Sequence, residues 1–313
     1  MVGRSAAISL EPLTLFEKLR ALAAFAASIW LWCAVGDMMV RPNDPLAALS
    51  LVANQSAYTA ALSAALLTIV VAMLAAAVGP ARLPGFASVT VCLGWAALNW
   101  RCGTMEYLLV YVGGAEAATR SALFGRLAIE TLFWCVLAAG SLWIEAAVRA
   151  WLGRGKADGS EKHDGSASRV GGKVEIRRGL LAAVIAAVVA TVFVSQVAGR
   201  SAVDEIHKGQ IYFAAGAGFL LGALIGLYFS FRVSPAYFVL GIFVTAALSY
   251  LWAMLRPIAD LSMEAYRGLP DVPPTALVRP LPVEYVALGM IGATVGIWSA
   301  HKVYVPRSEE GAR

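Results

Sequence analysis

Four charged residues in the first half of this 313-residue chain have the types and spacing of a polar binding site. Arg126 and Glu130 lie four residues apart in an apolar run, so a helix places them one turn apart on one face. Arg101 and Glu106 follow the preceding apolar run and are expected near the same membrane surface. Because charged side chains are expensive inside a membrane, they mark functional sites by default. The four residues therefore form a candidate polar site that would bind an anionic group or relay protons, but the interpretation we favour is a structural salt bridge of Arg126 and Glu130 at the lipid headgroups.

Elsewhere the sequence offers little for catalysis. Glu145 and Arg149 repeat the four-residue spacing at the other end of the same run, where we expect a structural ion pair. The chain contains no H-E-x-x-H, no Walker phosphate loop and no G-x-S-x-G motif, its three histidines lie outside the apolar runs, and its four cysteines form no C-x-x-C pair. We therefore predict no catalytic residue, no bound metal and no cofactor.

Two apolar runs carry glycines at four-residue spacing. Such a spacing puts the glycines on one helix face, where another backbone can approach closely. We interpret the two sets as static helix packing or dimerisation, and the alternative is a sliding contact between moving helices. The glycines are Gly218, Gly222 and Gly226 in one run, and Gly292 and Gly296 in the other.

The elements that must position these residues follow from composition. Hydrophobic residues make up 59% of the chain and charged residues 14%, with a mean hydropathy of +0.71, whereas soluble domains carry roughly 25% charged residues. The apolar residues are collected in runs near the length of about 20 residues that crosses a bilayer. The expected fold class is all-α, a polytopic integral membrane helical bundle of about eight transmembrane helices. Their expected ranges are 15–39, 57–78, 86–100, 123–151, 179–198, 210–231, 235–255 and 283–300.

The third run is the weakest span, because 15 residues reach only about 22 Å at 1.5 Å per residue. An extension through 101–112 as one longer helix is the alternative. Thr14 and Glu17 predict a capping box that starts the first helix.

The chain divides into two similar halves. Residues 1–152 form a first membrane half, 153–175 a flexible cytoplasmic linker rich in glycine, serine and charge, 176–304 a second membrane half, and 305–313 a polar C-terminal tail. Each half has the same order of spans and loops, which suggests a possible 4+4 duplication about an axis along the membrane normal.

Basic residues predict the orientation. With eight spans, 16 of the 25 basic residues fall on the side of both termini and the linker. Since basic residues favour the cytoplasmic side, both termini are expected there. Arginine outnumbers lysine by 19 to 6 and alanine is abundant, which favours a bacterial inner membrane.

The expected partners are the lipid bilayer and either other membrane proteins or further copies of the chain. Nucleic acid is not expected, because the basic residues lie between the apolar runs and not along one helix face. Intramembrane charge together with glycine-faced helices predicts a transporter-like permease or an integral subunit or scaffold of a membrane complex. The alternative is a membrane enzyme that acts on a lipid-linked or periplasmic substrate at the outer face.

Overall fold

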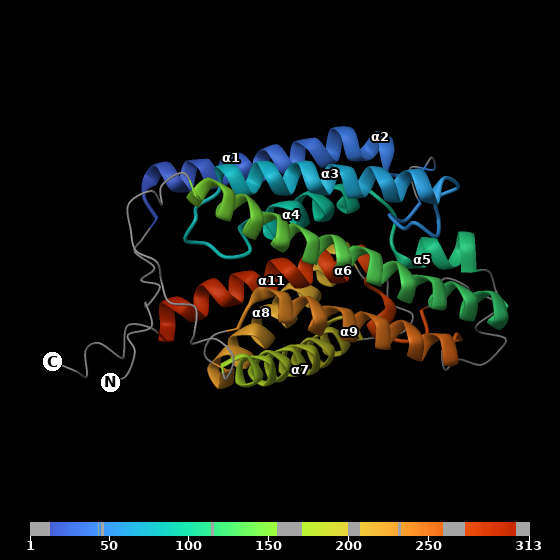
Figure 1. Ribbon diagram of the computed structural model, residues 1–313. Helices are drawn as coiled ribbons and strands as arrows, with labels where there is room; N and C mark the ends of the chain where they lie inside the picture. The colour runs from blue at the N-terminus through green and yellow to red at the C-terminus, as the bar shows by residue number, and fades with distance from the viewer. Residues whose placement is uncertain are drawn as a thin grey trace.

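The computed structural model is a helical bundle (Figure 1). It describes residues 13–42, 44, 47–113, 116–154, 171–199, 207–230, 233–258 and 273–304. Helices account for 82% of the structure, and the described residues form no strand. The all-α fold class is therefore confirmed. The tail 305–313 and most of the expected linker, 155–170, lie outside the described residues.

The first half contains four long helical segments and one short helix. Helix α1 starts at a complete capping box, in which Glu17 N donates to Thr14 Oγ1 over 3.2 Å and Thr14 N donates to Glu17 Oε2 over 2.9 Å. The bounds are α1 Leu15–Leu31, continued by a π-helical turn Trp32–Gly36 and α2 Asp37–Met39; α3 Ala57–Val78; α4 Phe86–Trp100; α5 Met105–Leu108, followed by a π-helical turn Leu109–Gly113; and α6 Ala117–Arg154.

The second half repeats four long helices. Their bounds are α7 Gly171–Val197, α8 Lys208–Ser230, α9 Pro235–Leu255 and α11 Pro282–Tyr304, with a 3-10 turn Ala276–Val278 before α11. Helices α6 and α7 are longer than expected, so helix covers both ends of the expected linker. The expected bounds of α3, α4 and α9 agree with the structure.

Seven of the described helical segments are long and apolar enough to cross a membrane. They are the segments that begin at Leu15, Ala57, Ala117, Glu175, Lys208, Pro235 and Pro282. A chain with this many such helices is a multi-pass membrane protein. The eighth expected span, α4, is shorter than the others at 15 residues.

The alternative in which α4 extends through 101–112 is wrong. Helix α4 ends at Trp100, and the chain turns before α5 begins at Met105. The backbone of this turn forms a hydrogen bond outside α4, since Gly103 N donates to Ala47 O over 3.0 Å. The amide of Gly103 is therefore paired with the segment before α3 and not with α4.

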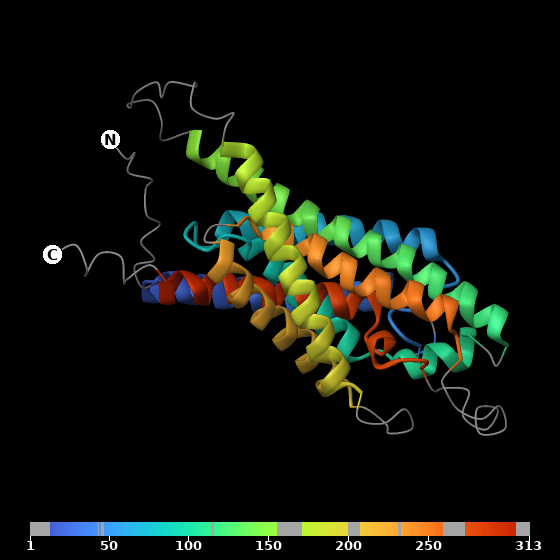
Figure 2. The ribbon, with the colours of Figure 1, turned by 90° about the horizontal axis from the view of Figure 1, so that it is seen from below.

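Helices α4 and α11 form the centre of the bundle. In Figure 1, α1 and α3 run along one side, α7 runs along the opposite side, and α4 and α11 lie between them. Helix α4 packs against α1, α3, α6 and α11, while α11 also packs against α6, α8 and α9. Every residue from 281 to 290 is buried. Figure 2 shows α7 crossing at an angle to α11.

Several contacts between helices repeat from one half to the other. In the first half α4 packs against α1 and α6, and α6 packs against α3; in the second half α9 packs against α7 and α11, and α11 packs against α8. Between the halves, α4 packs against α11 and α6 packs against α9. These two contacts are equivalent if α4 corresponds to α9 and α6 to α11. This is the pattern that a 4+4 duplication produces. The contact between α3 and α4 has no equally extensive counterpart between α8 and α9, and α7 packs far more extensively against α8 than α1 does against α3. The duplication stays a prediction.

The glycine stripes lie where α8 meets its neighbours. A Cβ on Gly222 would lie 2.7 Å from Ala186 Cα of α7, and Gly218 and Gly226 lie similarly close to that helix. On another face of α8, a Cβ on Gly292 would lie 2.1 Å from Gly216 O. Backbone therefore touches backbone on both sides of α8, which leaves no room for a side chain.

This packing predicts that Gly222→Ala destabilises the protein by roughly 1–3 kcal/mol, the usual cost of overpacking. The matched control is Gly140→Ala in α6, since a Cβ there meets nothing within 4 Å. That control should keep or raise stability, because alanine favours helix over glycine by about 1 kcal/mol. Thermal unfolding of the purified proteins in detergent measures both, and equal unfolding temperatures would contradict the packing.

Candidate functional site

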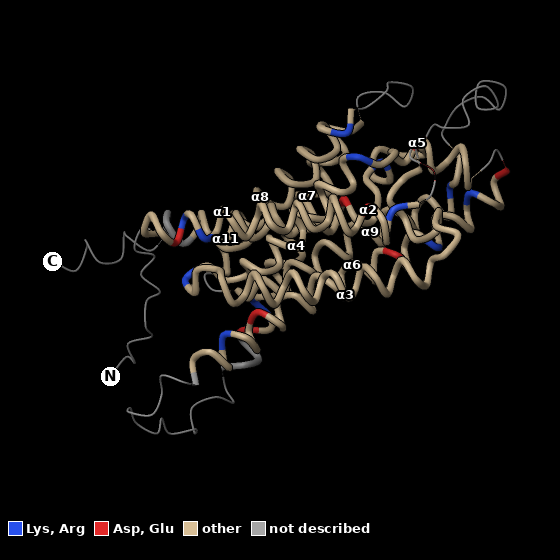
Figure 3. Tube along the Cα trace, turned by 90° about the horizontal axis from the view of Figure 1, so that it is seen from above, with Lys and Arg blue, Asp and Glu red and all other residues tan. Residues whose placement is uncertain are grey.

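The short helix α4 leaves backbone groups to be satisfied inside the bundle. The first four N–H groups and the last four carbonyls of a helix lack partners within it. In hydrocarbon each unsatisfied group costs several kcal/mol, and a helix of about 22 Å does not reach across a core of about 30 Å. Charged residues gather toward the two ends of the bundle (Figure 3). We call the end where α4 begins the Arg149 end, and the end where it finishes the Lys208 end.

At the Arg149 end, a buried carboxylate caps α4. Glu145 of α6 accepts hydrogen bonds from Gly85 N over 3.1 Å and Ala87 N over 2.9 Å. Arg149 lies 2.7 Å from Glu145 and donates to two carbonyls of the turn before α4. The expected structural ion pair is confirmed. Gly85 has a φ of 78°, a left-handed conformation that favours glycine.

At the Lys208 end, an ammonium group caps α4. Lys208 Nζ donates to Asn99 O, to Cys102 O over 2.7 Å and to Gly103 O over 3.2 Å. A cation at a helix C-terminus and an anion at its N-terminus both interact favourably with the helix dipole. Neighbouring helices therefore supply a charge of the appropriate sign at each end of α4.

The Lys208 cap belongs to a larger buried network. Asn99 Nδ2 donates to Glu284 Oε1 of α11 over 2.7 Å and to the Tyr212 hydroxyl of α8 over 2.9 Å. The Tyr212 hydroxyl donates in turn to a backbone carbonyl of α4. Lys208 Nζ lies 4.0 Å from Glu284 Oε1. Asn99 is fully buried, and the Glu284 side chain is 1% exposed.

A second charged pair adjoins this network. Glu106 of α5 and the buried Arg279, which follows the 3-10 turn before α11, have Oε1 and Nη1 4.0 Å apart. Glu106 lies three residues after Gly103, whose carbonyl accepts from Lys208, and Arg279 lies five residues before Glu284. We call the six residues Asn99, Glu106, Lys208, Tyr212, Arg279 and Glu284 the Lys208 cluster.

The Lys208 cluster joins the two halves of the chain. Its first two members come from the first half and its other four from the second. Of the six, sequence analysis identified only Glu106. The signal for two others was present, since Asn99 and Glu284 are polar residues within apolar runs. The sequence pattern gave no indication that residues more than 100 positions apart meet.

Glu130, from the predicted site, is buried in a different setting. Its carboxylate accepts from Ser50 Oγ over 2.5 Å, from Trp134 Nε1 over 3.0 Å and from Val52 N over 3.4 Å. It thereby fastens the non-helical segment before α3 to α6. The expected ion pair with Arg126 is wrong, because the Glu130 carboxylate points into the bundle while Arg126 is exposed.

The other predicted site residues have separate partners. Arg101 is exposed and donates to Cys33 O over 3.1 Å, in the π-helical turn that follows α1. Glu106 belongs to the Lys208 cluster. Within the described ranges, no hydrogen bond or ion pair joins any two of Arg101, Glu106, Arg126 and Glu130. A binding role for these four as one site stays a prediction.

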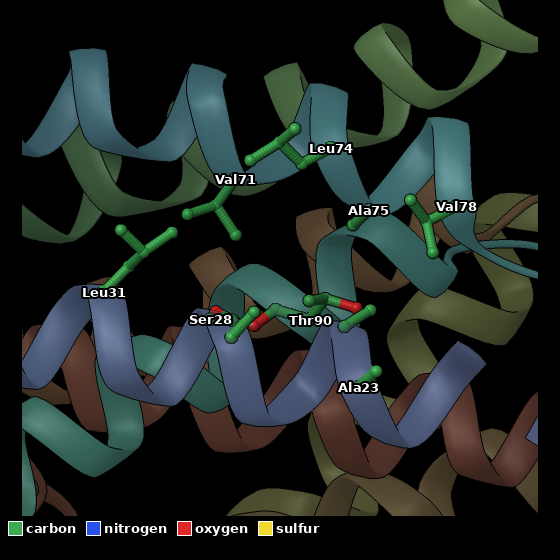
Figure 4. A pocket seen from close by; sticks show the side chains of 10 residues that line it. Ala23, Ser28, Leu31, Val71, Leu74, Ala75, Val78 and Thr90 are labelled. Atoms are coloured by element: carbon green, nitrogen blue, oxygen red, sulfur yellow. The ribbon is translucent and has the colours of Figure 1, made fainter. Parts of the chain in front are cut away.

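An apolar hollow of about 250 Å³ lies between α1 and α3 (Figure 4). Leu31, Val71 and Leu74 are among its walls, with small residues of α1 opposite α3. Its two hydroxyl-bearing residues are tied together, since Ser28 Oγ donates to Thr90 O over 2.6 Å. The hollow offers apolar contacts of the kind that suit an acyl chain, and its lining holds no charged residue.

The Lys208 cluster is suited to binding and proton exchange. It combines two cationic and two anionic side chains, and two of its buried oxygens, Asn99 Oδ1 and Glu106 Oε1, receive no hydrogen bond from the described part of the chain. Buried acceptors are normally paired, so such groups require an explanation. Comparison of the chain with models of protein families, with curated proteins and with solved structures gave no match.

The cap at the Lys208 end predicts that Lys208→Met destabilises the protein. The carbonyls of Cys102 and Gly103 lose their donor, while Asn99 O keeps the Cys102 amide, and each buried unsatisfied group costs about 1–3 kcal/mol. The matched control is Lys18→Met, because Lys18 is exposed on α1 and its loss should change little. Thermal unfolding in detergent compares the two variants, and an unchanged unfolding temperature for Lys208→Met would show that the carbonyls do not depend on the ammonium group.

Proposed function

We propose that the protein is a transporter-like permease of the bacterial inner membrane, with the Lys208 cluster as its polar site. The observation that carries the proposal is that charged side chains from both halves meet in one buried cluster. Transporters built from repeats bind substrates and coupling ions where the repeats meet. The pair Glu106 and Arg279 also links the segments that precede α6 and α11, which are equivalent under the 4+4 arrangement.

The distances between the charged groups of the Lys208 cluster support its role as a binding site. Both ion pairs have their closest atoms 4.0 Å apart, whereas close charged hydrogen bonds measure about 2.7–2.9 Å. The pair of Glu145 and Arg149 at the other end, at 2.7 Å, has the shorter distance. The two pairs of the Lys208 cluster are therefore held less closely than the pair at the Arg149 end.

The orientation belongs to the same proposal. Helix α4 is short, but it carries the chain from the Arg149 end to the Lys208 end, so eight helical segments connect the two ends. An even number puts residues 13 and 304 at the Arg149 end. The excess of basic residues in the turns and tails at that end supports a cytoplasmic Arg149 end.

One observation favours a second candidate, an integral subunit or scaffold of a membrane complex. Several buried charges perform structural tasks: Lys208 binds the carbonyls of α4, and Glu284 Oε2 accepts from Leu281 N over 2.7 Å at the start of α11. A scaffold needs only these tasks and predicts stable co-purification with partner proteins. No observation favours the membrane enzyme over either candidate.

The test is flux in reconstituted vesicles. Glu106→Gln is the informative variant, because the Glu106 carboxylate caps no helix. Vesicles containing a pH-sensitive dye are challenged with a proton gradient alone and with inorganic phosphate, carboxylates and amino acids in turn. The wild type should move protons or one of these solutes faster than protein-free vesicles, and Glu106→Gln should slow that flux at least tenfold.

Glu116→Gln is the matched control, since Glu116 is exposed at the same end, and its flux should equal that of the wild type. The permease is ruled out by wild-type flux that stays at the protein-free level for every probe. A Glu106→Gln variant as active as wild type would remove the cluster from the mechanism.

A further inference from the structure

The turn after α4 gathers oxygen atoms around one point. The carbonyls of Asn99, Cys102 and Gly103 all accept from Lys208 Nζ, and the Glu284 carboxylate lies 4.0 Å away. Oxygen atoms of carbonyls and carboxylates are the ligands of alkali cations in channels and transporters. Carbonyls at the C-terminal ends of interrupted helices coordinate such ions in particular.

We propose that this turn is a monovalent-cation site, which Lys208 fills with its own ammonium group and which a small free cation occupies when Lys208 withdraws. We call the three carbonyls and the Glu284 carboxylate the cation cage. The inference uses residues of the proposed transport site, but it requires only binding and not transport.

The cation cage is held together by bonds that do not involve Lys208. Arg101 N donates to Leu98 O over 3.1 Å and Cys102 N to Asn99 O over 3.0 Å, which close the turn. Gly103 N donates to Ala47 O over 3.0 Å, which fixes the last carbonyl of the cage against the segment before α3. A small cation that replaces the ammonium group therefore meets oxygens that these bonds already orient toward one point.

An empty cage would be costly. The carbonyls of Cys102 and Gly103 would lose their donor, and Glu284 would lose the cation beside it within a buried region. The C-terminal end of the α4 dipole adds further negative potential. Asn99, which contributes its backbone carbonyl to the cage, also has a buried side-chain oxygen, Oδ1, that accepts no hydrogen bond from the described residues. These charges and dipoles all favour a positive ion.

Lys208 has the properties of a removable occupant. It is the first residue of α8, and 11% of its side chain is exposed, so the side chain is not fully enclosed by the bundle. A lysine carries its charge on a flexible four-carbon chain. Exchange of this group for a free cation would couple cation entry to a rearrangement of the charges around Glu284 and Glu106.

The experiment removes the tethered ammonium and supplies free cations. Full-length Lys208→Ala is purified in detergent, and its thermal unfolding is followed in choline chloride and in sodium, potassium or ammonium chloride at equal ionic strength. We expect a lower unfolding temperature than wild type in choline. At least one small cation should restore half or more of the loss, with a saturable dependence on concentration.

Two controls separate site binding from general salt effects. Wild type, whose cage is filled, and Lys18→Ala, whose cage is intact, should unfold at the same temperature in all four salts. Adding Glu284→Gln to Lys208→Ala should weaken the apparent cation affinity at least tenfold. Protein that is recovered only in a small-cation salt, and not in choline, also supports the cage.

Equal unfolding temperatures of Lys208→Ala in all four salts would overturn the inference. If that variant is recovered in none of them, Lys208→Gln replaces it, and the absence of a cation response there has the same meaning. If a cation restores the stability of Lys208→Ala but the wild-type protein shows no flux, the cation site is supported and the permease is ruled out.

Discussion

The structure depends on one constraint: a helix too short to cross the membrane lies in the middle of a membrane bundle. Helix α4 is almost entirely buried, and both of its ends carry backbone groups that hydrocarbon does not satisfy. Glu145 supplies acceptors at its start and Lys208 supplies donors at its finish. Charged side chains are therefore placed at both ends of this short helix.

The same rule explains the other irregular segments. Arg101 donates to a carbonyl of the π-helical turn after α1, and Glu130 accepts from the non-helical segment before α3. At these two interruptions of regular helix, a polar side chain from another element bonds the backbone. At the Lys208 end, the side chains that satisfy the backbone come from both halves and include charged groups. The same residues therefore form the candidate site for transport and cation binding.

Much of the fold was predictable because the local sequence determines where a helix begins and ends. Hydropathy alone gave the bounds of α3 and α9, and Thr14 with Glu17 marked the start of α1. The site was less predictable, because the four-residue spacing of Arg126 and Glu130 gave their positions along the helix but not which side chain faces inward. Asn99, Lys208 and Glu284 meet only after α4, α8 and α11 pack, and nothing in the spacing of one sequence encodes that contact.

The central claim is that the Lys208 ammonium group holds the C-terminal turn of α4. Hydrogen–deuterium exchange of wild type and Lys208→Met tests it most directly, because the amides of Arg101 and Cys102 are bonded within that turn and the amide of Gly103 is bonded to the segment before α3. The account predicts faster exchange in peptides covering 98–104 in the variant, with α3 unchanged. Identical exchange in that turn would contradict it.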